Sequence, residues 1–214
     1  MNSRILHIFI AVSFCVASCK QNDVKNAASD FCINRVQKDQ GSWLLADTTL
    51  TIIATLFEYN QMNPDRYQFY SYNVDNQGIH HINAYQYVNR VKAFTGEMSF
   101  HFDANKTFRF ASGEEIAKIN LNNFPSLSQK QVSQLYLSVL QKDTFTGIDK
   151  DEIIGNCLDI EFGYYDLNAG TGNTVQNYAK AWKITPTGQM YPIAYVSDSK
   201  ADIIYYFNGV RFLQ

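Results

Sequence analysis

Residues 79–102 decide the fold of this chain, because three candidate strands follow one another closely in them. Residues 79–88 read IHHINAYQYV, residues 91–94 read VKAF and residues 97–102 read EMSFHF. In the third segment Met98, Phe100 and Phe102 alternate with polar residues, which is the period of a strand with one buried face. Short alternating segments that are separated by polar turns predict an antiparallel meander.

Further strands are expected on both sides of this meander. Residues 67–74 alternate ahead of a turn at 75–78, and residues 107–111 return after a turn at 103–106. The chain has 14 Tyr and 15 Phe, residues that favour strands. Strands are also expected toward the C-terminus, within residues 157–165, 176–186, 191–196 and 203–207.

The clearest helix is expected after Ser128, which is a good N-cap residue. Its apolar positions recur at helical spacing and form a packing stripe of Val132, Leu135, Val139 and Leu140. A second helix is favoured for residues 47–59, with Asp47 as its cap, although the β-branched residues there would also suit a strand. Residues 31–36 are expected to form a short helix or turn.

The N-terminus has the pattern of a bacterial export signal. Arg4 precedes a mostly apolar run at 5–16, and this run is too short to cross a bilayer. The following Val16-Ala17-Ser18-Cys19 resembles the lipobox of bacterial lipoproteins, which implies cleavage after residue 18 and lipid attachment to Cys19. A plain signal peptide with a chance cysteine is the alternative.

The expected location is the bacterial outer membrane, with the chain anchored by lipid. Residues 20–23 are polar and include an acidic residue, and they resemble the export tags of Bacteroides-type surface lipoproteins. Both a cell-surface and a periplasm-facing orientation stay open.

Two cysteines remain after the signal and the lipidated residue are set aside. Cys32 and Cys157 would lie in an oxidising compartment, where a disulfide is expected; two free buried thiols are the alternative. Neither belongs to a C-x-x-C pair, so nothing supports a redox or zinc role.

Two stretches resemble known families of exported modules. Residues 81–94 with 97–103 resemble the core motif of fungalysin/thermolysin propeptide domains, although Arg90 and Lys92 replace the usual Gly and Pro. Residues 179–205 resemble a PepSY-type domain, with Asp202 in the position of a usual Gly. No H-E-x-x-H metalloprotease motif follows.

The resemblance implies an α+β fold of two propeptide/PepSY-like units, each an antiparallel sheet with a helix packed on one face. The expected division is a signal at 1–18, a tether and N-terminal segment at 19–44, and units at 45–125 and 126–214.

The chain offers no catalytic constellation, and we expect no enzyme activity, cofactor or metal. His80 and His81 are neighbours and face opposite sides of a strand, so one of them could meet His101 across a hairpin, but no third zinc ligand is indicated. The net charge of −2, without a long basic run, argues against nucleic acid as a partner.

The expected function is therefore that of a membrane-anchored, exported, non-catalytic protein-binding module, acting as a protease inhibitor or chaperone on another exported protein. Tyrosine is both a strand residue and a common contact residue, so the tyrosines of the meander either pack the sheet or form a ligand face. The alternative function is a carbohydrate- or small-ligand-binding surface lipoprotein that uses this face, formed by Tyr70, Tyr72, Tyr85 and Tyr87.

Overall fold

The computed structural model describes residues 32–35, 52–54, 58, 66–116, 118–145 and 147–210. The chain divides into two compact units, residues 1–30 and 31–214, and the described residues belong to the second unit. The expected export signal and Cys19 lie outside the described residues. No described helix has the length and apolar character that crossing a membrane requires.

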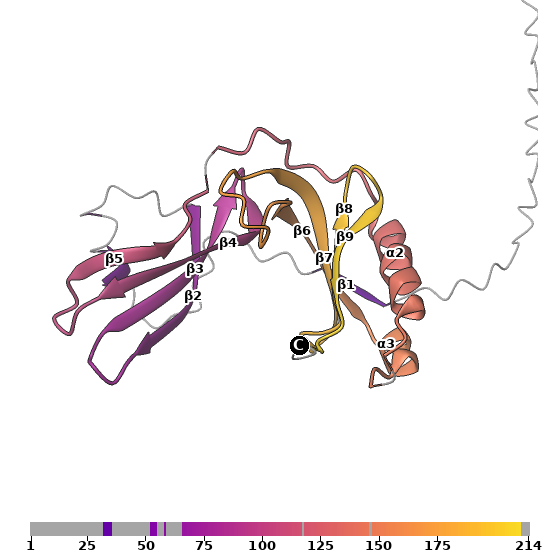
Figure 1. Cartoon of the computed structure of the whole chain (residues 1–214), viewed down its shortest axis with the longest axis horizontal. Helices are drawn as coiled ribbons and strands as arrows, with labels where there is room; N and C mark the ends of the chain where they lie inside the picture. Colours follow the sequence, from indigo (N-terminus) through magenta and orange to yellow (C-terminus); the bar gives the residue numbers. More distant parts are fainter. Residues whose placement is uncertain are drawn as a thin grey trace, which may run out of the picture. The chain divides into compact units, whose positions relative to one another are not determined.

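The described strands form one mixed sheet of nine strands (Figure 1). Its main path runs in the order β2-β3-β4-β6-β7-β8-β9, while β5 pairs with β4 and β1 pairs with β6. The strands are β1 (Ile33–Arg35), β2 (Tyr67–Val74), β3 (His80–Val88), β4 (Val91–Phe102), β5 (Phe108–Gly113), β6 (Leu158–Asp166), β7 (Tyr178–Pro186), β8 (Ile193–Ser197) and β9 (Asp202–Phe207).

The expectation of two antiparallel sheets in two helix-on-sheet units is wrong, because β4 and β6 join the strands into a single sheet. The C-terminal half of β4 pairs antiparallel with β5, whereas Lys92 and Ala93 near its start pair parallel with Gly163 and Tyr164 of β6. The start of β6 pairs in turn with β1. Strand β4 extends beyond β5, and strand β6 extends beyond β1. The backbone groups that β5 and β1 leave unpaired on these edges allow β4 and β6 to pair with each other.

A two-residue turn at Asn89 and Arg90 reverses the chain between β3 and β4. Both residues have positive φ angles, 52° and 65°, as a type I′ hairpin turn requires. This turn takes the place of the Gly and Pro expected from the propeptide resemblance. Farther along the hairpin a β-bulge between Tyr85 and Tyr87 shifts the register, and beyond it His81 lies opposite His101.

The predicted helix after Ser128 is present as α2 (Gln129–Lys142). The Ser128 side chain accepts from the Gln131 backbone N–H, and the Gln131 side chain accepts from the Ser128 N–H, which completes a capping box. Helix α2 contacts β7, β8 and β9 (Figure 1). Its buried face is rotated from the predicted stripe and consists of Val132, Ser133, Tyr136, Leu137 and Leu140.

The remaining helical segments agree less well with the sequence pattern. Helix α3 (Lys150–Gly155), capped by the Asp149 side chain, is not among the elements that the sequence predicted. Of the helix favoured for residues 47–59, the described residues 52–54 and 58 are helical, and Ile52 and Ile53 pack into the core over β2–β4. The helix or turn expected at 31–36 is wrong, since residues 33–35 form β1.

Strand β1 is held against β6 by backbone and covalent contacts. The Leu158 N–H donates to the Cys32 carbonyl at 2.9 Å, and three residues of β1 pair in parallel with β6. Cys32 and Cys157 form a disulfide with a Cα–Cα distance of 4.4 Å. This link and the parallel pairing favour an extended conformation at a site where the local pattern suggested a helical turn.

A buried carboxylate fixes the start of α2 against the sheet. Asp198, in the turn between β8 and β9, is 1% exposed and lies 3.0 Å from the Lys180 ammonium. It accepts hydrogen bonds from the Trp182 indole and from the backbone N–H groups of Ser126 and Leu127. No buried side-chain polar atom of the described residues lacks a hydrogen-bond partner.

Candidate functional site

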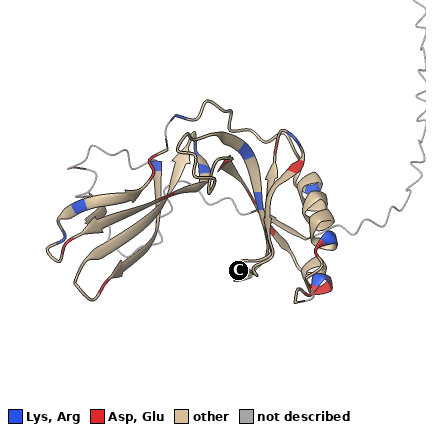
Figure 2. Ribbon diagram, in the orientation of Figure 1, with Lys and Arg blue, Asp and Glu red and all other residues tan. Residues whose placement is uncertain are grey.

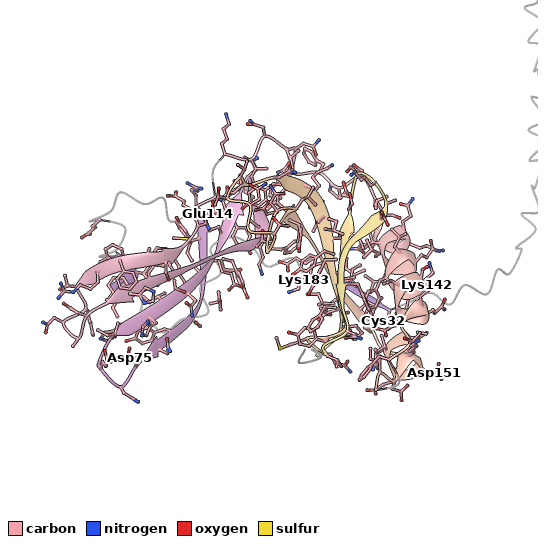
Figure 3. All side chains as sticks on the ribbon, viewed as in Figure 1. Cys32, Asp75, Glu114, Lys142, Asp151 and Lys183 are labelled. Carbon is pink, nitrogen blue, oxygen red and sulfur yellow. A yellow bond between two sulfur atoms is a disulfide. The ribbon has the colours of Figure 1, made fainter. Side chains whose placement is uncertain are left out.

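The two sides of the sheet differ in character. We call the side opposite α2 the open face. On β6–β8 the side chains of Ile160, Trp182 and Val196 pack toward α2, so the alternate residues Glu161, Lys183 and Tyr195 belong to the open face. Acidic and basic residues are interspersed over the described strands and helices without a patch of one sign (Figure 2), and Lys183 is labelled on its strand in Figure 3.

Aromatic and charged side chains gather on the open face where β4 changes partner from β3 to β6. Tyr70 and Tyr85 stack with centroids 4.2 Å apart, and the Tyr70 hydroxyl donates to Glu97 at 3.2 Å. Where β4 pairs with β6, the Tyr195 ring is near two others, with centroid distances of 5.4 Å to Phe94 and 4.6 Å to Tyr165. We call this group the junction cluster: Tyr70, Tyr85, Lys92, Phe94, Glu97, Glu161, Tyr165 and Tyr195.

Lys92 links the two parts of the junction cluster. Its ammonium lies 3.3 Å from the centroid of the Tyr85 ring and 3.9 Å from the Glu161 carboxylate, and the residue is 7% exposed. A lysine cation over a tyrosine ring is attracted by the negative face of the ring. Tyr70 already covers one face of Tyr85, so Lys92 occupies the other, and the ring is held from both sides.

The tyrosine hydroxyls of the junction cluster stay protonated over the whole physiological range. Burial raises the pKa of Tyr195, and the neighbouring Tyr165 and Glu161 raise it further. Burial and then the Glu97 charge raise the pKa of Tyr70 to about 12. These groups are therefore hydrogen-bond donors and acceptors set beside carboxylates, and they carry no negative charge of their own.

Local backbone features put these rings in place. A β-bulge between Phe69 and Ser71 directs Tyr70 to the side of Tyr85. In β6, a Cβ on Gly163 would lie 2.4 Å from the Phe94 ring, so the absence of a side chain there makes room for Phe94 to reach Tyr195.

The four tyrosines predicted as a ligand face do not share one surface. Tyr70 and Tyr85 stack in the junction cluster. Tyr72 lies on the opposite side, partly buried against the core of β2–β4 and bonded to His80 Nδ1 at 2.6 Å. Tyr87 is 3% exposed and donates to Gln68.

Sequence reasoning missed Lys92, Glu97, Glu161 and Tyr195 as members of one site. Each stands at an alternating position of a recognisable strand, so the face of each was predictable. Their meeting depends on the short parallel pairing of β4 with β6, which has no local signal in the sequence.

The described residues also line two cavities outside the junction cluster. No group of three or more His, Cys, Asp and Glu side chains among them could hold a metal ion. A shallow cavity of about 450 Å³ is lined by Arg66, Val88, Glu115, Ile116 and Lys118, and its Arg66 is engaged with Glu115 at 2.8 Å. A second cavity of about 270 Å³ lies between the start of α3 and the turn before β8.

No protein-family model matches this chain, and no curated protein matches it. Among solved structures, the C-terminal domain of Bacillus megaterium YpeB aligns with 80% of this chain and 69% of its own length, at 6% identity and a TM-score of 0.39. The PepSY-type fold therefore stays a prediction. A TM-score of this size carries no argument about family or function, and the propeptide and lipoprotein assignments stay predictions.

Proposed function

We propose that this chain is an exported, lipid-anchored, non-catalytic binding protein whose partner, another exported protein, docks on the open face over the junction cluster. The observation that carries the proposal is the group of four tyrosines and one phenylalanine around Lys92, Glu97 and Glu161. The expected location is an outer membrane, to which lipid on Cys19 would anchor the chain among other exported proteins.

Tyrosines held in place suit a protein interface. Tyrosine is enriched among the residues that contribute most to binding energy, because it offers a large contact area and a polar tip while losing little conformational entropy. In the junction cluster the rings are already ordered by their neighbours, so less entropy is lost when a partner binds. The exposed Glu97 carboxylate and the more buried Glu161 and Lys92 would then select a partner with complementary charges.

Glycan binding by the same tyrosines is supported less well. A sugar stacks on a free ring face, but Tyr85 is covered by Tyr70 on one side and by Lys92 on the other. Tyr72 packs beside His80 on the opposite side of the sheet. The stacked pair of Tyr70 and Tyr85 therefore leaves one outer ring face, that of Tyr70.

Site-specific photo-crosslinking in the native envelope tests the protein-binding proposal. A photoreactive phenylalanine analogue replaces Tyr205, which is 44% exposed and lies 6.3 Å from Tyr195. The matched control carries the analogue at Phe124, a 72% exposed aromatic outside the junction cluster. We expect a crosslinked product of discrete mass from position 205 and none of that mass from position 124.

The absence of a discrete product at position 205, or the same product at both positions, would refute the proposal. A glycan array distinguishes the carbohydrate alternative. Binding that is lost in Tyr70→Ala and retained in Tyr72→Phe, without a crosslinked protein, would favour a sugar ligand.

A further inference from the structure

Two histidines face each other on β3 and β4, away from the junction cluster. His81 and His101 are directly opposed in the register, and their Nδ1 atoms are 2.8 Å apart. The other nitrogen of each ring has a partner: His81 Nε2 is 3.0 Å from Asp75 Oδ2, and His101 Nε2 is 2.9 Å from Ser112 Oγ. The His101 ring also stacks on Phe110 at 4.4 Å.

When both rings are neutral and no ion is bound, the hydrogen bonds of this group define the tautomers. Asp75 is an acceptor, so His81 carries its proton on Nε2 and presents a lone pair at Nδ1. His101 then donates its Nδ1–H to that lone pair and accepts at Nε2 from the Ser112 hydroxyl. Burial and the neighbouring His81 lower the pKa of His101.

We propose that His81 and His101 chelate a divalent late transition-metal ion, Zn²⁺ or Cu²⁺, through their two Nδ1 atoms. The paired carboxylate and hydroxyl are the kind of outer partners that orient ligating histidines. Metal binding moves one proton of His101 from Nδ1 to Nε2, where the Ser112 hydroxyl turns to accept it. Neither ring loses a proton overall.

Chelation requires the two rings to move slightly apart and to turn, because the Nδ1 atoms now point at each other and must instead point at a shared ion. Two nitrogens bound tetrahedrally at about 2.0–2.1 Å from zinc lie about 3.3 Å apart, roughly 0.5 Å more than the present Nδ1–Nδ1 distance. The His81 side chain is 25% exposed, so the ion is reachable from solvent. With two protein ligands, water or a bound partner completes the coordination. Imidazole nitrogen suits copper and zinc, whereas Mg²⁺ and Ca²⁺ prefer oxygen.

Titration calorimetry of the full chain with Zn²⁺ at pH 7.5 tests the site. We expect one ion per chain to bind at this pair, and His81→Ala or His101→Ala to weaken that binding by about tenfold or more. His80→Gln is the matched control, because His80 is adjacent in sequence but lies on the other face of β3 beside Tyr72. It should leave the binding unchanged.

Asp75→Asn gives a sharper test without removing a ligand. Asp75 lies at the turn between β2 and β3 (Figure 3), where its Oδ1 accepts from the Gln77 and Ile79 N–H groups; an amide oxygen can keep those bonds. The new amide N–H₂ would face His81 Nε2 and force the proton onto Nδ1, which blocks the ligand position. We expect Zn²⁺ affinity to fall about tenfold or more while thermal stability changes little.

Zn²⁺ binding that is absent, or that is equal in wild type, His81→Ala and His101→Ala, would overturn the proposal. So would retention of full affinity in Asp75→Asn. Because both histidines are partly exposed, the variants should fold; circular dichroism verifies this, and His101→Gln replaces His101→Ala if it does not.

Discussion

Replacing Asp198 with alanine is expected to lower the free energy of unfolding by about 3–5 kcal/mol, the usual cost of removing one partner from a buried ion pair. The change leaves the Lys180 ammonium, the Trp182 indole and two backbone N–H groups at the start of α2 without their acceptor. Asp198→Asn keeps an oxygen but loses the charge, so we expect about 1.5–3 kcal/mol, the worth of a charge-assisted hydrogen bond.

The pH dependence of this effect has a definite sign. Burial alone would raise the pKa of Asp198, but hydrogen bonds from Leu127, Trp182 and Ser126 and the Lys180 ammonium hold it below its usual value. A lowered folded-state pKa contributes stability above the unfolded value of about 3.9, and this is lost as the pH falls through the folded pKa. The difference between wild type and Asp198→Asn should therefore be constant above about pH 5 and shrink below about pH 4.

Urea unfolding followed by tryptophan fluorescence and far-UV circular dichroism measures both effects. Asp202→Ala is the matched control, because this exposed carboxylate lies in the same hairpin and should change stability by about 0.5 kcal/mol or less. A loss below about 1 kcal/mol for Asp198→Ala, or a loss no larger than that of the control, would refute the assignment of Asp198 as the residue that fixes the start of α2.

Three further substitutions probe other parts of the fold. Cys32→Ala with Cys157→Ala removes a link across 125 residues and should cost about 4–5 kcal/mol in the chain-entropy model, measured against the oxidised wild type; an unchanged melting temperature would contradict this. Gly163→Ala brings a methyl group against the Phe94 ring and should cost about 1–3 kcal/mol, and a gain in stability would show that this region is loosely packed. Ser128→Ala removes the cap of α2 and should cost about 1 kcal/mol by urea unfolding, whereas no loss would mean that water replaces the cap.

The elements that the sequence predicted correctly have local causes. Helix α2 begins where Ser128 can cap it, and the strands of the meander follow from alternation between turn residues such as Asp75 and Gly78. The pairing of His81 with His101 agrees with the prediction that one of the adjacent histidines could meet His101. These features depend on residues close together in sequence, or on a single hairpin.

The features that the sequence did not predict depend on pairing between strands far apart in sequence, or on one inserted residue in a strand. Two parallel residue pairs between β4 and β6 turn two expected units into one sheet, and nothing near Lys92 or Gly163 signals this. In β2, strict alternation would place Tyr70 and Tyr72 on the same face, but the bulge at Tyr70 shifts the phase and sends them to opposite faces. The one extra residue in this bulge therefore places the tyrosines of the predicted ligand face on two different sides of the sheet.

The disulfide also determines how the protein would bear a mechanical load. A pull on the chain ahead of Cys32 passes through the sulfur bridge directly to Cys157 and into β6. The chain between the two cysteines, which includes β2–β5, α2 and α3, forms a covalently closed loop that tension from the N-terminal end cannot draw out. Were the protein tethered by that end, the force would enter at an interior strand of the sheet, and β1 would not be peeled away as an unbridged three-residue strand could be.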